Sequence, residues 1–454
     1  MTRSWFPRTI VLLMICSGLA LICRPAWCQE EAPETDADAG SGADAQLLIP
    51  PAVSNQSYPT EFAGDTEQNY LRGGFTFSSA YTSNVTGTSN SPTGDMSYSL
   101  WPNLAINRVT PTLHLVFSYS PGFTIYQKTS AYDQANQNLA FGLQDRISPR
   151  LSLSLQETFQ KSSNVFDRPT PLGASALSGA PPATGLGVIP PLANQNDNAT
   201  SAQLAYQLGE TSSLGVTGNY VTLRYPNSQQ SVELYNSRSG SGSMFYSHRL
   251  GEKYYIGASF QYQNILSYQT NLPSTHVQTE TVFAFLSVFL KPTLSISVSG
   301  GPQHYTGTEP LSSRVSSWSP FLMVSGAWQG QRTTLAANYS RIVSAAGGLN
   351  GVFHSTTVGA SASWKVNRNW IAGLGATYGN NTSVTPLFFS SSGGRTILGT
   401  VSAQRTLGAH ANLQFGYSWT NQTYQQFAPS ASITNINRAF VSLSYQFTKP
   451  LQKY

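Results

Sequence analysis

Residues 370–378 read WIAGLGATY, and apolar residues take every second position from Trp370 to Tyr378. Successive side chains of a β-strand point to opposite faces, so this period of two gives one apolar face and one mainly polar face. Similar runs occupy residues 113–119, 151–155, 202–208, 254–262, 318–328, 358–366, 411–419 and 439–447. We count about eighteen such runs between Tyr70 and Phe447, spaced by roughly 20 residues, which predicts an all-β chain.

The composition supports uncharged strands. The 454 residues carry a net charge of +5, and only 10% of them are charged, against roughly 25% in soluble proteins. Hydrophobic residues make up 40% of the chain and aromatic residues 12%. This balance excludes a coiled coil, a highly charged disordered chain and a helical enzyme.

The connections between the runs alternate in length. Short connections are predicted near residues 107–111, 145–150, 208–212, 248–252, 291–293, 329–331, 367–369 and 406–409. Longer polar connections are predicted near residues 83–95, 163–196, 225–231, 267–275, 305–316, 343–355, 379–395 and 420–435. This asymmetry favours a transmembrane antiparallel up-and-down β-barrel of about 18 strands (16–18), with short periplasmic turns and long extracellular loops, over a soluble sandwich.

Three segments are predicted along the chain. Residues 1–28 combine arginines, a short apolar stretch and all three cysteines, which indicates a secretory signal peptide, with a retained anchor as the alternative. Residues 29–67 are acidic, contain no base and show no apolar period, so we expect a flexible periplasmic tail. Residues 68–454 form the expected barrel.

Aromatic residues recur at both ends of the apolar faces. In a barrel that crosses lipid, such residues form two girdles that flank an apolar band about 25 Å tall. The residues predicted for these girdles are Tyr206, Tyr254, Tyr262, Trp318, Trp328, Trp364, Trp370, Tyr378, Trp419 and Phe447.

The pattern from Tyr70 to Phe447 resembles that of porin-like outer-membrane β-barrel proteins of Gram-negative bacteria. The last run, residues 439–447, is similar to the aromatic-ended final strand that the barrel-assembly machinery recognises. The resemblance implies an outer-membrane location and contact with outer-membrane lipid and lipopolysaccharide. The chain departs from the family by continuing past that strand, to Tyr454.

A barrel of this size leaves an aqueous lumen unless something plugs it. The longest connection, residues 163–195, contains Asp167 and Arg168 and is a candidate constriction loop, with a disordered external loop as the alternative. The strand alternation places seven ionisable residues on polar positions as pore-lining candidates: Arg72, His114, Lys253, Glu280, Arg332, Lys365 and Arg438. Because six of the seven are basic or histidine, we expect a lumen that favours anions, although those near a rim could instead be solvated or contact lipid headgroups.

The expected function is passive diffusion of small hydrophilic solutes, anionic ones included. An outer-membrane barrel of an exopolysaccharide export system and a structural or adhesive barrel are the alternatives. The six histidines show no metal-ligand spacing, and no nucleophile elbow, phosphate loop or dinucleotide motif occurs. We therefore expect no enzymatic activity, no cofactor, no metal and no nucleic-acid partner.

Overall fold

The computed structural model describes residues 69–451 except 88–91, 131–132, 163–193, 227–233, 270–273, 292, 309–313, 346–347, 350, 385–392 and 425–432. The predicted signal peptide (1–28), the predicted tail (29–67) and Asp167 and Arg168 of the predicted constriction loop lie outside the described residues.

Eighteen strands account for most of the described chain. They are β1 Tyr70–Thr82, β2 Asp95–Val109, β3 Leu113–Tyr126, β4 Gln134–Ser148, β5 Leu151–Ser162, β6 Gln195–Gln207, β7 Ser212–Arg224, β8 Asn236–Arg249, β9 Tyr254–Tyr268, β10 Thr275–Lys291, β11 Leu294–Thr308, β12 Val315–Gln329, β13 Thr333–Ser344, β14 Phe353–Lys365, β15 Trp370–Ser383, β16 Gly393–Leu407, β17 Ala411–Tyr424 and β18 Ile433–Pro450.

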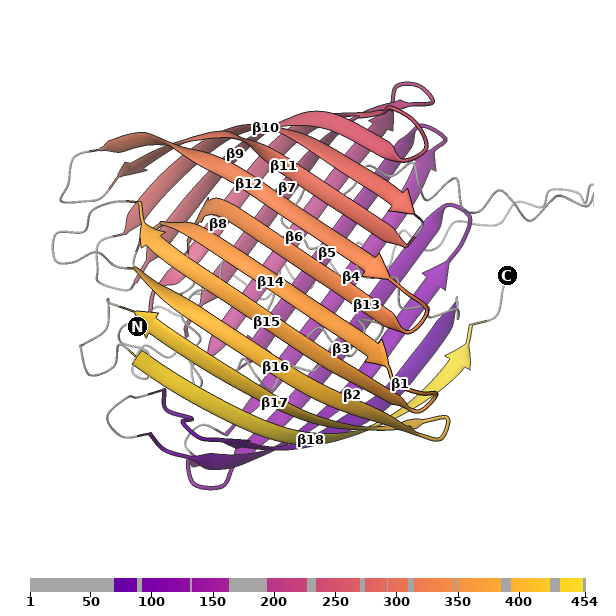
Figure 1. Ribbon diagram of the computed structural model, residues 1–454, viewed down its shortest axis with the longest axis vertical. Helices are drawn as coiled ribbons and strands as arrows, with labels where there is room; N and C mark the ends of the chain where they lie inside the picture. Colours follow the sequence, from indigo (N-terminus) through magenta and orange to yellow (C-terminus); the bar gives the residue numbers. More distant parts are fainter. Residues whose placement is uncertain are drawn as a thin grey trace, which may run out of the picture. The chain divides into compact units, whose positions relative to one another are not determined.

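The sheet closes on itself (Figure 1). Each strand pairs antiparallel with its neighbours in sequence, and β18 pairs with β1 from Tyr70↔Pro450 to Thr82↔Arg438. Closure leaves no free sheet edge at this junction, as lipid requires, because the bilayer core offers backbone groups no other hydrogen-bond partner. The predicted 18-stranded up-and-down barrel is confirmed.

The connection lengths alternate as predicted. Connections of two to four residues join β2–β3, β4–β5 and every second pair up to β16–β17, and all eight match predicted short turns. The other connections have six residues or more. The sequence reading missed one of them, residues 127–133 between β3 and β4, because its seven residues lack the glycine and proline punctuation of the longer ones.

Neighbouring strands are strongly staggered. The stagger can be followed by stepping from each residue to its partner on the next strand. These steps lead from Gly73, the fourth residue of β1, to Thr308, the last residue of β11. Continued around the barrel, the offset is about 22 residues, which corresponds to a strand tilt of about 40° and a backbone diameter of about 36 Å. A cylinder this wide encloses more space than its inward side chains fill on their own.

One parity of each strand faces outward and carries exposed apolar side chains. Examples are Phe75 and Phe77 on β1 and Leu286 on β10, which are between 40% and 46% exposed. All ten predicted girdle aromatics occupy this outward parity. Nine are among the exposed hydrophobics, and Trp370 lies partly under the guanidinium of Arg405. An exposed apolar band between aromatic rows is typical of a transmembrane barrel.

Several inward aromatic rings lie over a glycine of the next strand. Trp101 covers Gly122, Phe245 covers Gly215, and Phe285 covers Gly257. The same relation holds between Phe440 and Gly416 and between Tyr424 and Gly394. Because glycine has no Cβ, the ring can lie directly against the barrel wall. A bulky ring at such a position therefore adds little to the thickness of the wall.

Gly301 on β11 is expected to tolerate no side chain. A Cβ there overlaps the carbonyl oxygen of Val282 and lies 2.7 Å from the Cα of Phe283, whereas a Cβ at Gly242 meets nothing within 4 Å. We predict that Gly301→Ala destabilises the barrel by about 2–4 kcal/mol. Heat-modifiable migration in detergent gels over a urea series measures this. Gly242→Ala is the control, and equal stability of the two variants would contradict the prediction.

Candidate functional site: the lumen and its mouth

The inward parity of the strands is rich in uncharged polar side chains. Hydroxyl and amide groups line the wall on all sides, among them Ser99, Thr124, Thr217, Ser259, Thr281 and Thr420. Many of them pair across strands, as Ser78 does with Ser99 at 2.6 Å and Ser287 with Ser297 at 3.0 Å. Such groups exchange hydrogen bonds with water and with solutes without presenting a fixed charge.

One part of the inward wall is apolar. Phe283 and Phe285 on β10 and Phe321 on β12 form a buried cluster against Met323 and Ile342. The rings of Phe283 and Phe321 lie 4.8 Å apart above Gly301, which separates them on β11. We call these five residues the phenylalanine strip. The sequence analysis expected a mainly polar inward face and did not anticipate this strip.

Four of the predicted pore-lining residues lie on inward-facing strand positions. Arg72 on β1 donates to the Thr448 hydroxyl at 3.3 Å and stacks on Tyr70. His114 on β3 is hydrogen-bonded to Asn107 at 3.2 Å, and Arg438 on β18 is 5% exposed with its guanidinium over Phe440. Lys365 takes an inward position at the last residue of β14, whereas Lys253 and Arg332 lie in short turns.

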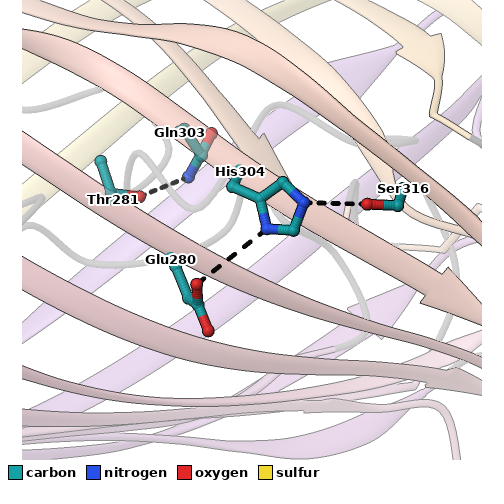
Figure 2. A network of polar contacts seen from close by, with 5 residues as sticks. All are labelled: Glu280, Thr281, Gln303, His304 and Ser316. Atoms are coloured by element: carbon teal, nitrogen blue, oxygen red, sulfur yellow. Dashed lines mark hydrogen bonds and ion pairs between the residues drawn. The ribbon is translucent and has the colours of Figure 1, made fainter.

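Glu280 does not face the lumen, which corrects the sequence expectation. Inward positions of β10 are the buried Thr279, Thr281 and Phe283, so Glu280 shares the outward parity with Val282. Its carboxylate lies 4.0 Å from Nδ1 of His304, whose Nε2 is 2.8 Å from the Ser316 hydroxyl (Figure 2). The expectation failed because a polar residue near a strand end was assigned to the polar face, whereas outward positions above the apolar band are also polar.

Two further bases occupy inward positions near the short turns. Arg146 on β4 pairs with Ser152, and Arg249 on β8 pairs with the inward Tyr255. Together with Arg72 and Lys365 they place four bases at this end of the lumen, which we call the basic rim. Strand parity alone could have identified Arg146 and Arg249, since Gln144 and Ser247 precede them by two residues.

Inward acids lie at the opposite end of the lumen. Asp95, the first residue of β2, accepts hydrogen bonds from the backbone amides of Met96, Lys128 and Thr129 and from the Thr129 hydroxyl at 2.7 Å. It therefore anchors the connection between β3 and β4. Asp197 on β6 is also on an inward position at this end.

The lumen end at the long connections, here called the mouth, is crossed by chain. Leu349, between β13 and β14, accepts a hydrogen bond from the Ser267 hydroxyl of β9 at 3.3 Å and belongs to a buried cluster with Phe353 of β14 and Tyr424 of β17. β9 and β17 lie almost opposite each other in the strand order. The connection therefore links distant parts of the wall.

Neighbouring connections hold this crossing segment. Gly348 accepts from the backbone amide of Tyr235 at 3.1 Å, and Val352 accepts from that of Val384 at 2.9 Å. Gly348 and Gly351 have φ of 84° and 108°, conformations that other residues rarely adopt. We call Tyr235, Gly348, Leu349, Gly351, Val352 and Val384 the mouth cap. The sequence reading noted residues 343–355 only as a long connection.

No protein-family model and no curated protein matches the chain. Solved structures match at low identity. OccK2 (OpdF) from Pseudomonas aeruginosa is 10% identical, with 85% of this chain and 100% of that chain covered and a TM-score of 0.42. OpdK from Pseudomonas aeruginosa, solved with vanillate, is 8% identical, with 84% and 99% covered and a TM-score of 0.41. The ferric citrate transporter FecA is 9% identical, with 84% and 79% covered and a TM-score of 0.38.

Closure of eighteen antiparallel strands around an inward polar face, with an exposed apolar outer face, decides the fold class. The chain has the fold of a transmembrane β-barrel. Across the ranges that the structure describes, no helix is long and apolar enough to cross a membrane. Within those same ranges, no group of three or more His, Cys, Asp or Glu side chains could hold a metal ion.

Proposed function

We propose that this barrel is an outer-membrane channel through which small hydrophilic solutes diffuse passively, with a preference for anions. The basic rim carries the proposal. Four bases occupy inward positions at one end of the lumen, and Arg438 adds a fifth at the other end, where the inward acids Asp95 and Asp197 also lie. A ring of one sign lowers the barrier for ions of the opposite sign.

The acids weaken this preference only in part, because five inward bases outnumber two inward acids. The Asp95 carboxylate is occupied by backbone amides and the Thr129 hydroxyl, which hold it against the wall. The remaining lumen groups are hydroxyls and amides, which solvate a hydrophilic solute of either sign. The proposed role is non-enzymatic and needs no cofactor.

The proposed route to the membrane follows from the chain ends. Residues 1–28 would direct export and be removed, and residues 29–67 would lie in the periplasm. The final strand, with Tyr445 and Phe447 exposed on its outward face, would be the segment that the barrel-assembly machinery binds. Lipid and lipopolysaccharide would then surround the exposed apolar band.

The mouth cap specifically supports one of the alternatives. A structural or adhesive barrel needs no open lumen, and the segment through Leu349 narrows the mouth. A polysaccharide exporter fits less well, because a thick polymer must pass the same opening.

Reversal potentials in planar bilayers under a KCl gradient test the proposal. We expect measurable single-channel conductance and a reversal potential of the sign that chloride preference gives, declining as ionic strength rises because salt screens the rim. A cation-selective reversal potential would refute the anion preference. The absence of conductance from correctly folded protein would favour the structural alternative.

A further inference from the structure

The wall of the barrel is not continuously paired between β12 and β13. Their ladder runs from Gln329↔Thr334 to Leu322↔Arg341 and ends there. Beyond this point β12 stays paired with β11 as far as Val315, and β13 stays paired with β14 as far as Ser344. The two strands therefore part toward the end that carries the long connections (Figure 1). We call this unpaired boundary, residues 315–321 against 342–344, the seam.

β13 leaves the wall because its end turns into the lumen. Val343 is 1% exposed and packs with Ile265, Val277 and Tyr305, which are inward residues of β9, β10 and β11. Its backbone amide donates to Oε1 of Gln303 on β11 at 3.2 Å instead of to β12. The Gln303 amide in turn donates to the Thr281 hydroxyl at 3.0 Å (Figure 2).

One side chain bridges the seam from the other side. His354 of β14 is hydrogen-bonded through Nδ1 to the Ser319 hydroxyl of β12 at 3.2 Å, and its ring meets that of Tyr305 edge-on at 5.4 Å. The seam is thus closed by two side-chain hydrogen bonds and by the packing of Ile342 and Val343, where a ladder of backbone bonds would otherwise stand. Each hydrogen bond contributes only about 1 kcal/mol net, and side chains can exchange these contacts for contacts with a passing molecule, which a backbone ladder cannot do.

The two sides of the seam have the chemistry of a passage for amphipathic molecules. On the inside, the phenylalanine strip leads to it, since Phe321 lies on β12 within the seam and Ile342 on β13 faces it. On the outside, Trp318 is 68% exposed and His304, Ser316 and Glu280 are polar. Exposed tryptophan beside polar groups marks the boundary between hydrocarbon and headgroups, where unpaired backbone can still reach water.

We propose that the seam is a lateral passage between the lumen and the outer leaflet of the membrane. It would serve small amphipathic molecules that have an aromatic or alkyl part and a polar part. The apolar part contacts Phe283, Phe285 and Phe321, and the polar part exchanges hydrogen bonds with Gln303, Ser319 and His354 as the molecule passes. This route goes beyond the proposed diffusion of hydrophilic solutes, which use the length of the lumen.

Cross-linking the seam tests the proposal. In full-length protein with Cys16, Cys23 and Cys28 replaced by serine, Ser319→Cys and His354→Cys are introduced together. Dibromobimane, which fluoresces once it joins two thiols, then links β12 to β14 in intact Gram-negative cells. The entry rate of N-phenylnaphthylamine, an aromatic probe that lipopolysaccharide slows, is measured before and after linking. We expect the rate to fall about tenfold, toward that of cells without the protein.

Two controls keep the test decisive. Ser78→Cys with Ser99→Cys places thiols across the continuous β1–β2 ladder, and linking them is expected to leave the entry rate unchanged. Phe283→Ser with Phe321→Ser, checked for folding by heat-modifiable migration, should slow entry without any cross-link and leave KCl conductance unchanged.

The outcomes separate this proposal from the channel proposal. An entry rate that does not change when the Ser319 and His354 positions are linked would overturn the lateral passage. A loss of probe entry and of KCl conductance together would also overturn it, because both would then use one axial route. A barrel that conducts no KCl but still shows seam-dependent probe entry would refute only the axial channel.

Discussion

Shortening the connection between Ala345 and Val352 to two glycines is expected to raise the single-channel conductance by about threefold or more, because a channel's current is limited by its narrowest part. Leu349 and Gly351 are the residues of this connection that reach across the mouth, to Ser267 of β9 and toward Tyr424 of β17. Removing them takes away the crossing segment while β13 and β14 keep their ladder from Thr333↔Trp364 to Ser344↔Phe353. Planar-bilayer recordings in KCl measure the change.

A graded variant and a control accompany this deletion. Ser267→Ala removes the hydroxyl that donates to the Leu349 carbonyl and accepts from the Gly351 amide, so we expect more frequent current fluctuations with a smaller rise in mean conductance. Shortening residues 269–274, another connection at the mouth, should leave conductance near that of the parent protein. If the two shortened barrels conduct alike, the mouth cap does not limit flow.

Reversing the charge of the basic rim is the second large effect that we expect. With Arg72, Arg146, Arg249 and Lys365 all replaced by glutamate, the rim changes from four positive to four negative groups on inward positions. The chloride-to-potassium permeability ratio should fall about tenfold or more and the reversal potential should change sign at low salt. Recordings at two ionic strengths separate this effect from a change in pore size, since charge effects decline with salt.

Outward arginines at the same end of the barrel provide the matched control. Arg108 on β2 and Arg405 on β16 lie on the outward parity, and Arg405 stacks on Trp370 in the girdle. Replacing both with glutamate reverses charge at the same rim but outside the lumen, so selectivity should stay the same. Equal shifts in the two variants would show that the lumen position of the four bases is not what sets selectivity.

Strand parity explains why much of the wall could be predicted. Trp370–Tyr378 and the other alternating runs assign each side chain to one face, because a strand has a fixed period of two whatever its neighbours are. Arg72, His114 and Arg438 were placed on the inward parity for this reason. Glu280 was misplaced because residues above the apolar band no longer alternate between apolar and polar, and the sequence then carries no sign of which face is which.

The mouth cap and the seam could not be predicted, since both depend on contacts between segments far apart in sequence. Gly348, Leu349 and Gly351 read as an ordinary glycine-containing loop, and only folding brings Leu349 to Ser267, 82 residues earlier in the chain. The apolar Leu349 and Val352, each next to a glycine, were the one local sign that this connection turns inward. Val343 and Gln303 give no such sign, because alternation continues through β13 after it has left β12.

The sequence by itself determined that the chain forms a closed barrel, roughly how many strands it has, which rim carries the long connections and which faces are apolar. These properties are local, because alternation and turn length act over a few residues and lipid permits only closed sheets. The tertiary structure alone decided which connection crosses the mouth, where the wall loses its pairing and which aromatic rings line the lumen. Those features arise from packing between strands that are neighbours only in the finished cylinder, where Phe283 can meet Phe321 over Gly301 and Gln303 can replace a strand as the partner of Val343.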